Sequence, residues 1–317
     1  MTHAPALWLG FSGLVLILLV LDLGVLNRRS HTLSLREASV WSGALVTTAL
    51  LFGGFIWWMS GVQPALEYYT GYLIELSLSV DNLFVFILIF QYFQVPPELR
   101  AKVLKWGIMG AIIMRAVMIG VGALLIARFH WITWVFGGIL ILAGIKMFRG
   151  GHETIRPEKN PVLRLTRRLM PTLKHYHGAA FFVKRRGLWL ATPLFLAVVF
   201  VEWSDLVFAI DSIPAIFAVT RDPFIVYSSN IFAILGLRAL FFVLASVMDR
   251  FVYLAKGVAI VLLLVGVKMV AAEWVRISTP VSLAAIGGIL SASVALSLWA
   301  SRPRPEEIGR ASCRERV

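Results

Sequence analysis

The sequence predicts an all-α polytopic membrane protein with about nine transmembrane helices, and three observations support this fold class. Of the 317 residues, 59% are hydrophobic and 15% are charged, and the mean hydropathy is +0.83, whereas soluble domains are about half apolar and about a quarter charged. Several apolar runs approach the roughly 20 residues needed to cross a bilayer core of about 30 Å. These runs lack the alternation of barrel strands, so we expect helices as the spanning elements.

The predicted spans follow one another with short connections and one long basic segment. The first is interpreted as a retained span, because no basic stretch precedes its apolar run and no convincing small-residue cleavage site follows it. The predicted spans are 7–26, 38–60, 66–93, 103–127, 131–148, 192–219, 226–247, 252–272 and 280–299.

We divide the chain into six regions on this basis. They are a two-helix region (1–65), a three-helix unit (66–148), a basic cytoplasmic loop (149–191), a second three-helix unit (192–272), a last helix with a short tail (273–306), and a terminal stretch (307–317). The terminal stretch resembles read-through of vector sequence and carries the sole cysteine, Cys313. We therefore predict that it is not native, and no function is inferred from it.

Positive charge is distributed unevenly among the connections. With the N-terminus outside, ten Lys or Arg residues fall on the cytoplasmic side between 149 and 186, whereas the outer side has only Arg128, Arg221 and Arg276. This asymmetry predicts a multi-pass protein of the bacterial inner membrane with an external N-terminus and a cytoplasmic C-terminus. The net charge of +13 then indicates topology and contact with anionic membrane lipid, and not a nucleic-acid partner.

The chain contains an internal repeat, in which two segments share a pair of carboxylates six residues apart, followed by a small polar residue. They are Glu75-Leu-Ser-Leu-Ser-Val-Asp81-Asn82 in the third predicted span and Asp205-Leu-Val-Phe-Ala-Ile-Asp211-Ser212 in the sixth. The next span in each case contains one arginine, Arg115 or Arg238, and the span after that ends in a Gly-x-Lys motif at Lys146 or Lys268.

Three crossings in each unit would place the second unit upside down relative to the first. The inverted repeat is the plan of many secondary transporters, whose substrate sites lie near the bilayer midplane where the repeats meet. The alternative is a gene duplication that now serves only packing.

The charged residues of the repeat favour a cation site over packing alone. Each charge at the centre of a bilayer costs on the order of 3 kcal/mol on insertion scales. Arg115 and Arg238 are predicted charge partners for five acids, which leaves an excess of about three negative charges that a divalent cation, retained protons or both would offset. The five acids are Glu75, Asp81, Glu202, Asp205 and Asp211.

The spacing within the repeat constrains how the acids would meet. Six residues turn two side chains of one helix about 120° apart, so the two carboxylates of one unit cannot be adjacent ligands. Two antiparallel copies would bring Asp81 and Asp211 together, with Glu75 and Asp205 above and below. Pro214 is predicted to open the sixth span after Asp211 and free carbonyl ligands; a packing kink is the alternative.

The other candidate ligands are also oxygen donors. Asn82 and Ser212 fall on the repeated motif, and Asp22 and Asn230 are candidates for a longer pathway. Oxygen ligands suit Mg²⁺, Ca²⁺ and Mn²⁺. No nucleophile, mid-span histidine or cofactor motif accompanies the acids, so we expect neither an enzyme nor a bound cofactor.

These motifs resemble those of the TerC/Alx family of integral membrane proteins. The resemblance rests on the stretch beginning Leu21-Asp22, on the motif that starts at Glu75 and on residues 202–216, and it covers nearly the whole chain before the terminal stretch. It implies export of Mn²⁺ by a membrane protein, with homologues linked to tellurite resistance.

Two functional hypotheses follow. The first is alternating access by the two units, with metal ligands Asp81 and Asp211 at the centre and possible exchange against protons. The second is a membrane scaffold that recruits partners through the basic loop, as a metal-supply or stress-resistance subunit without transport of its own. The oligomeric state is left open.

Overall fold

The computed structural model describes most of the chain. The described residues are 5–25, 35–129, 131–149, 163, 165–166, 168, 170–173, 175–185, 188–247, 253–274 and 277–300. Within the helices among them, the side chains at 23–25, 80, 81, 84, 211, 238, 244–247 and 273 are not described.

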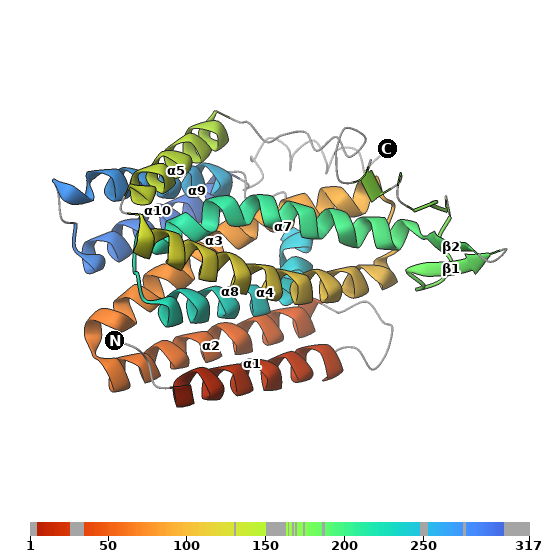
Figure 1. Ribbon diagram of the computed structural model, residues 1–317, viewed down its shortest axis with the longest axis horizontal. Coiled ribbons are helices and arrows are strands. Elements are labelled where there is room, and N and C mark those ends of the chain that lie inside the picture. The colour runs from red at the N-terminus through yellow and green to blue at the C-terminus, as the bar shows by residue number, and fades with distance from the viewer. Residues whose placement is uncertain are drawn as a thin grey trace, which may run out of the picture.

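The described residues form a bundle of long helices that run roughly side by side (Figure 1). Each of the predicted spans falls on one helix. The elements are α1 (Pro5–Val25), α2 (Leu35–Ser60), α3 (Val62–Tyr92), α4 (Pro97–Arg128), α5 (Ile132–Phe148), β1 (Phe182–Arg185), β2 (Leu188–Ala191), α7 (Pro193–Phe217), α8 (Pro223–Val247), α9 (Leu254–Val270), the 3₁₀ turn η3 (Ala271–Glu273) and α10 (Thr279–Ala300).

Within the part of the chain that the structure describes, five helices are long and apolar enough to cross a membrane. They are α1, α2, α4, α7 and α10, while α5 and the first part of α8 are shorter apolar helices. The hydrophobic stretch of α1 is 17% buried and that of α7 is 50% buried, which places α1 at the edge of the bundle and α7 inside it. Apolar helices with exposed apolar faces are expected where the solvent is lipid. The protein is therefore a mainly helical membrane protein, and the count of nine crossings stays a prediction.

The two three-helix units pack mainly against each other. Helix α3 contacts α7, α4 contacts α8 and α5 contacts α9, and the crosswise pairs α3 with α8 and α4 with α7 also pack. Helix α8 lies deep among them, because the side chains of 228–235 are almost completely buried. The middle of the bundle is thus formed jointly by the two units.

Helices α5 and α9 approach to backbone contact. A Cβ atom at Gly137 would lie 3.1 Å from the carbonyl oxygen of Gly266, and one at Gly144 would lie 2.9 Å from that of Ala259. Residue numbers rise on one helix as they fall on the other, so the pair is antiparallel. Small residues allow such close crossings in membranes.

A short β-hairpin precedes α7 and was not predicted. Strands β1 and β2 are antiparallel, with Phe182 opposite Ala191 and Lys184 opposite Trp189. The hairpin adds a short sheet to the predicted helical fold within the predicted basic loop, where two charged residues in β1 hide the strand pattern. Of the basic loop predicted at 149–191, residues 149, 163, 165–166, 168, 170–173, 175–185 and 188–191 are described.

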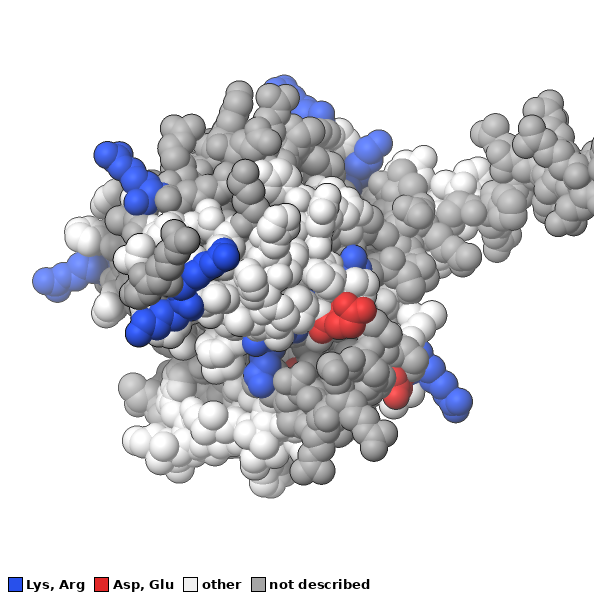
Figure 2. All heavy atoms as spheres, turned by 90° about the vertical axis from the view of Figure 1, so that its right-hand side faces the viewer, with Lys and Arg blue, Asp and Glu red and all other residues white. Residues whose placement is uncertain are grey.

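The segment before the hairpin is fixed to the ends of α3 and α4. The hydroxyl of Tyr176 donates to the carbonyl of Phe93 at 2.7 Å, and Lys102 Nζ donates to the carbonyl of Ala179 at 2.6 Å. Burial raises the pKa of Tyr176 to about 12, so its phenol remains a hydrogen-bond donor at neutral pH. Figure 2 shows this end of the molecule, with Lys and Arg side chains distributed around it. We predict that it faces the cytoplasm.

Pro214 does not open its helix in the middle of the span. Helix α7 continues through Pro214 to Phe217, and the amide of Ala218 still donates to the Pro214 carbonyl at 3.0 Å. A proline disturbs the turn that precedes it, and here that turn is close to the helix end. The predicted break after Asp211 is therefore not observed.

Candidate functional site

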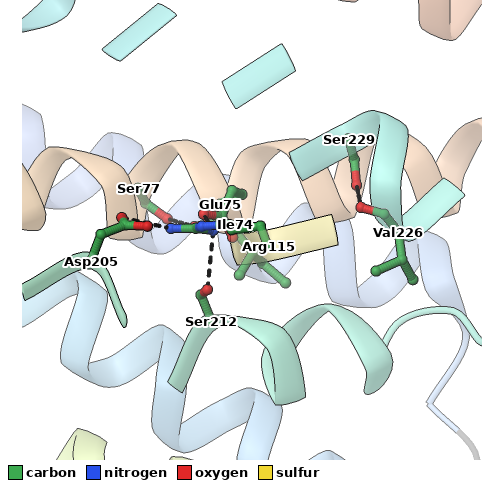
Figure 3. Close-up of polar contacts among 8 residues, drawn as sticks. All are labelled: Ile74, Glu75, Ser77, Arg115, Asp205, Ser212, Val226 and Ser229. Atoms are coloured by element: carbon green, nitrogen blue, oxygen red, sulfur yellow. Dashed lines mark hydrogen bonds and ion pairs between the residues drawn. The ribbon is translucent and has the colours of Figure 1, made fainter. Parts of the chain in front are cut away.

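A buried arginine joins the two units at the middle of their helices. Arg115 of α4 is fully buried, and its Nη1 forms an ion pair with Glu75 Oε1 of α3 and donates to Ser212 Oγ of α7 at 3.2 Å. Its Nη2 donates to Asp205 Oδ1 of α7 at 3.3 Å. Figure 3 shows the guanidinium between the two carboxylates, with Ser212 on a third side. The site thus combines equivalent acids of the two repeated motifs.

The charges of this cluster do not cancel. Glu75 and Asp205 are 0% and 3% exposed, and as carboxylates they carry two negative charges against one positive charge on Arg115. Ionised groups are costly to bury, and removal of one partner from a buried pair leaves an uncompensated charge. With both acids ionised, the described cluster has a net charge of about −1, which would favour the approach of another cation; a proton retained on one acid would offset that charge.

The hydrogen bonds of the cluster are also incomplete. Among the described residues, Glu75 Oε2, Asp205 Oδ2 and Arg115 Nε have no hydrogen-bond partner. Arginine and carboxylate commonly form two parallel bonds of about 2.7–2.9 Å, whereas here each acid offers one oxygen and the bond to Asp205 measures 3.3 Å. Each acid thus retains an oxygen that a further ligand could use.

A second carboxylate of α7 lies beside the cluster. Glu202 precedes Asp205 by three residues, so the two share one helical face. A Cβ atom at Gly110 of α4 would collide with the Glu202 carboxylate, so the glycine makes room for it. A small cavity of about 10 Å³ adjoins Asp205 and is lined by α3, α4, α7 and α8; this is about the room that one water needs.

Three predicted site residues lie outside the described side chains. They are Asp81 of α3, Asp211 of α7 and Arg238 of α8. The predicted meeting of Asp81 with Asp211 is therefore not described. The structure does give the register of the two helices, because Gly71 lies beside Ile216 and one guanidinium nitrogen binds both Glu75 and Ser212. Helices α3 and α7 consequently run antiparallel across the site.

The remaining predicted residues are placed as follows. Asn82 of α3 is 3% exposed, close in sequence to the unpaired hydroxyl of Ser79. Asn230 of α8 is fully buried, and neither atom of its amide has a hydrogen-bond partner among the described residues. Asp22 is buried at the end of α1 and accepts a 2.6 Å bond from Trp41 Nε1 of α2, so its described contact is with the two-helix region.

Two features of the surroundings were missed by sequence reasoning. Gly110 has no side chain that a sequence pattern could single out, and its role is to leave room for the Glu202 carboxylate that lies over it. At the other end of the bundle, Gln63 donates to Thr279 at 2.9 Å and Lys268 donates to Ser282 at 2.8 Å. These bonds fix α10 to α3 and α9, and no spacing rule connects residues so far apart in the chain.

The described part of the site consists of the Arg115 guanidinium held by two carboxylates, and it is not a preformed metal site. No three described His, Cys, Asp or Glu side chains are grouped closely enough to hold a metal ion. Two acids from different units, each with an unpaired oxygen, surround one guanidinium. The two acids could bind another cation within the bundle only if the Arg115 side chain moved away from them.

Comparisons with known proteins agree on one family. The profile described as "Integral membrane protein TerC family" matches residues 60–305. An uncharacterized membrane protein of Myxococcus xanthus, STKORF319, is 49% identical over 302 residues, which are 95% of each chain. The Escherichia coli K12 protein named "Putative membrane-bound redox modulator Alx" is 43% identical over 317 residues, covering 96% of this chain and 98% of that one. No solved structure matches the chain.

Proposed function

The chain belongs to the TerC family of integral membrane proteins, and from this premise we propose that it exports a divalent cation, foremost Mn²⁺, from the cytoplasm. The match to the family profile confirms the family predicted from the sequence motifs. The proposal is carried by one observation: equivalent acids of the two repeated motifs, Glu75 and Asp205, bind one buried cationic group in the middle of the bundle.

The packing of the two units supports alternating access. Each helix of one unit contacts its counterpart in the other unit: α3 contacts α7, α4 contacts α8, and α5 contacts α9. The contact of α3 with α8 likewise has its equivalent in the contact of α4 with α7. Gly137 with Gly266 and Gly144 with Ala259 repeat the same contact in the opposite sense. Such a pattern is expected of an inverted repeat, in which one unit rocks against the other around a fixed site.

The ligands of the proposed site favour a hard divalent ion. Glu75 and Asp205 supply carboxylates, with Glu202 as an accessory acid beside Asp205, and Asn82 and Ser212 supply neutral oxygens on the same two helices. Oxygen sites of this kind suit Mn²⁺, Mg²⁺ and Ca²⁺. We propose Asp81 and Asp211 as further ligands from their places in the repeat, and proton exchange as the source of energy. The preference for Mn²⁺ and the outward direction rest on the family resemblance.

A flux measurement on the reconstituted full chain tests the proposal. Proteoliposomes are loaded with a Mn²⁺-sensitive dye, and uptake is followed with and without an imposed pH gradient for the wild type and for Glu75→Gln, Asp81→Asn, Asp205→Asn and Asp211→Asn. We expect flux in the wild type and a loss of about 100-fold in each variant, because each substitution removes one carboxylate of the proposed site, the scale of truncating one partner of a buried charge pair.

The matched control is Glu98→Gln, which removes an exposed carboxylate in the first turn of α4. Its flux should equal that of the wild type. Absence of wild-type flux from correctly folded protein would exclude the transporter, and the scaffold that acts through the basic loop would become the better hypothesis. Flux that survives all four acid substitutions would retain transport but reject these ligands.

A further inference from the structure

Arg115 occupies the place that a transported cation would need. Its guanidinium contacts Glu75, Asp205 and Ser212, one acid from each unit and a neutral oxygen. These are three of the oxygens from which the proposed site is built. A metal ion bound by Glu75 and Asp205 therefore has to compete with the arginine that is already there.

Arg115 is held closely by Glu75 and more loosely by α7. It forms a close ion pair with Glu75, whereas its contact with Asp205 measures 3.3 Å, longer than the usual charged bond of about 2.7–2.9 Å, and its 3.2 Å bond to Ser212 is to a neutral hydroxyl. Its Nε and one oxygen of each acid have no partner among the described residues. A pair selected only for stability would be expected to use the full fork of the guanidinium, as buried arginines commonly do.

An empty carrier faces an electrostatic difficulty that this arrangement solves. After the ion is released, the emptied carrier must return to its starting conformation with its carboxylates buried and without a metal to neutralise them. Uncompensated charges in low dielectric raise the barrier to any movement that keeps them buried. A cation attached to the protein by its own side chain offsets one of these charges, and a proton taken up in the proposed exchange would offset the other.

We infer that Arg115 is a built-in substitute for the transported cation, displaced by the metal in the loaded carrier and bound to Glu75 and Asp205 in the empty one. This inference rests on the proposed function. It assigns Arg115 a role in the return step and not in binding the metal. The loaded carrier should consequently move without Arg115, whereas the empty carrier should not.

Exchange and net transport separate these two steps. Proteoliposomes with Mn²⁺ on both sides report exchange, for which only the loaded carrier has to move, while liposomes with Mn²⁺ on one side report net flux, which needs the empty carrier to return. For Arg115→Met we expect exchange comparable to the wild type and net flux lower by about 100-fold. The control Arg128→Met removes an exposed arginine from the end of the same helix and should preserve both rates.

A conservative variant keeps the test decisive if Arg115→Met does not fold. Arg115→Lys retains the charge but offers an ammonium in place of the planar fork, so net flux should fall by about tenfold with exchange preserved. Equal loss of exchange and net flux in the folded variants, or no loss of either, would overturn the role of Arg115 while leaving wild-type transport standing. Absence of both rates in the wild type would overturn the proposed function as well.

Discussion

The two three-helix units place similar residues at their shared centre and different ones beside it. Glu75 of α3 and Asp205 of α7 bind the same guanidinium. Three residues before Asp205, and thus nearer to the β-hairpin that precedes α7, the helix has Glu202, whose carboxylate lies over Gly110. At the corresponding position α3 has Tyr72, which is 6% exposed and stacks on Tyr68 with ring centroids 6.3 Å apart.

This difference bears on the proposed direction of transport. In the proposed mechanism, a symmetric centre would allow the same site to be reached from either side of the membrane. An acid on one side and packed aromatic rings on the other make the two approaches chemically unequal. If the hairpin end faces the cytoplasm, the acidic approach is the inner one, which suits capture of a cation from the cytoplasm and its release outward.

The largest expected effects come from the symmetric centre. Asp205→Asn and Glu75→Gln each remove one of two acids on one guanidinium, so both should lower Mn²⁺ uptake into inside-out vesicles, by about 100-fold and to a similar extent. Vesicles with Glu98→Gln provide the baseline. A large loss in one variant with nearly normal uptake in the other would show that the two acids are not equivalent.

A smaller and one-sided effect is expected from the asymmetric flank. Glu202→Gln should raise the KM for Mn²⁺ presented on the hairpin side by about tenfold and change kcat less, because an acid at the approach concentrates cations without ligating them in the final site. The KM from the opposite side should stay as in the wild type. Equal changes from both sides would place Glu202 in the central site instead.

Much of the fold could be predicted from the sequence because lipid imposes a simple rule. Long apolar runs have to be helices, and each predicted span does fall on a helix. The β-hairpin could not be found in this way, because β1 contains Lys184 and Arg185 and each four-residue strand depends on pairing with the other. Pro214 misled the prediction, because α7 continues through Pro214 to Phe217 although the proline has no amide to donate to the preceding turn.

The candidate site was predicted in its parts but not in its assembly. The repeat identified Glu75, Asp205 and Arg115 as related charged residues. Arg115 contacts both acids because of the way α4 crosses α3 and α7. This crossing is set by close contacts such as that of Gly107 with Val201. Contacts of this kind arise from the packing of whole helices, and a single sequence contains no local signal for them.

The symmetric scaffold can be tested through its glycines. Gly144→Ala and Gly266→Ala occupy equivalent places in the α5 and α9 crossing, and each new Cβ would lie about 3 Å from a carbonyl oxygen of the opposite helix. Each substitution should lower the free energy of unfolding by about 1–3 kcal/mol, as overpacking does, measured by thermal unfolding in detergent. Gly138→Ala, with nothing within 4 Å, serves as the control. If one of the two substitutions destabilised the protein much more than the other, the two helices would not contribute equally to the crossing.

The smallest effect on transport is expected at the hairpin, which has no counterpart in the repeat. Trp189 of β2 is 59% exposed, and its cross-strand neighbour is Lys184, so neither its packing nor its charge environment reaches Arg115. Trp189→Ser should therefore leave Mn²⁺ flux in proteoliposomes at the wild-type rate, because surface substitutions away from structural features change stability by only about 0.5 kcal/mol.

A partner that binds this end of the protein would give a different result in cells: resistance to Mn²⁺ would be lost with Trp189→Ser while flux in the purified protein persisted. That pairing of results would assign recruitment to the unrepeated hairpin and transport to the repeated helices.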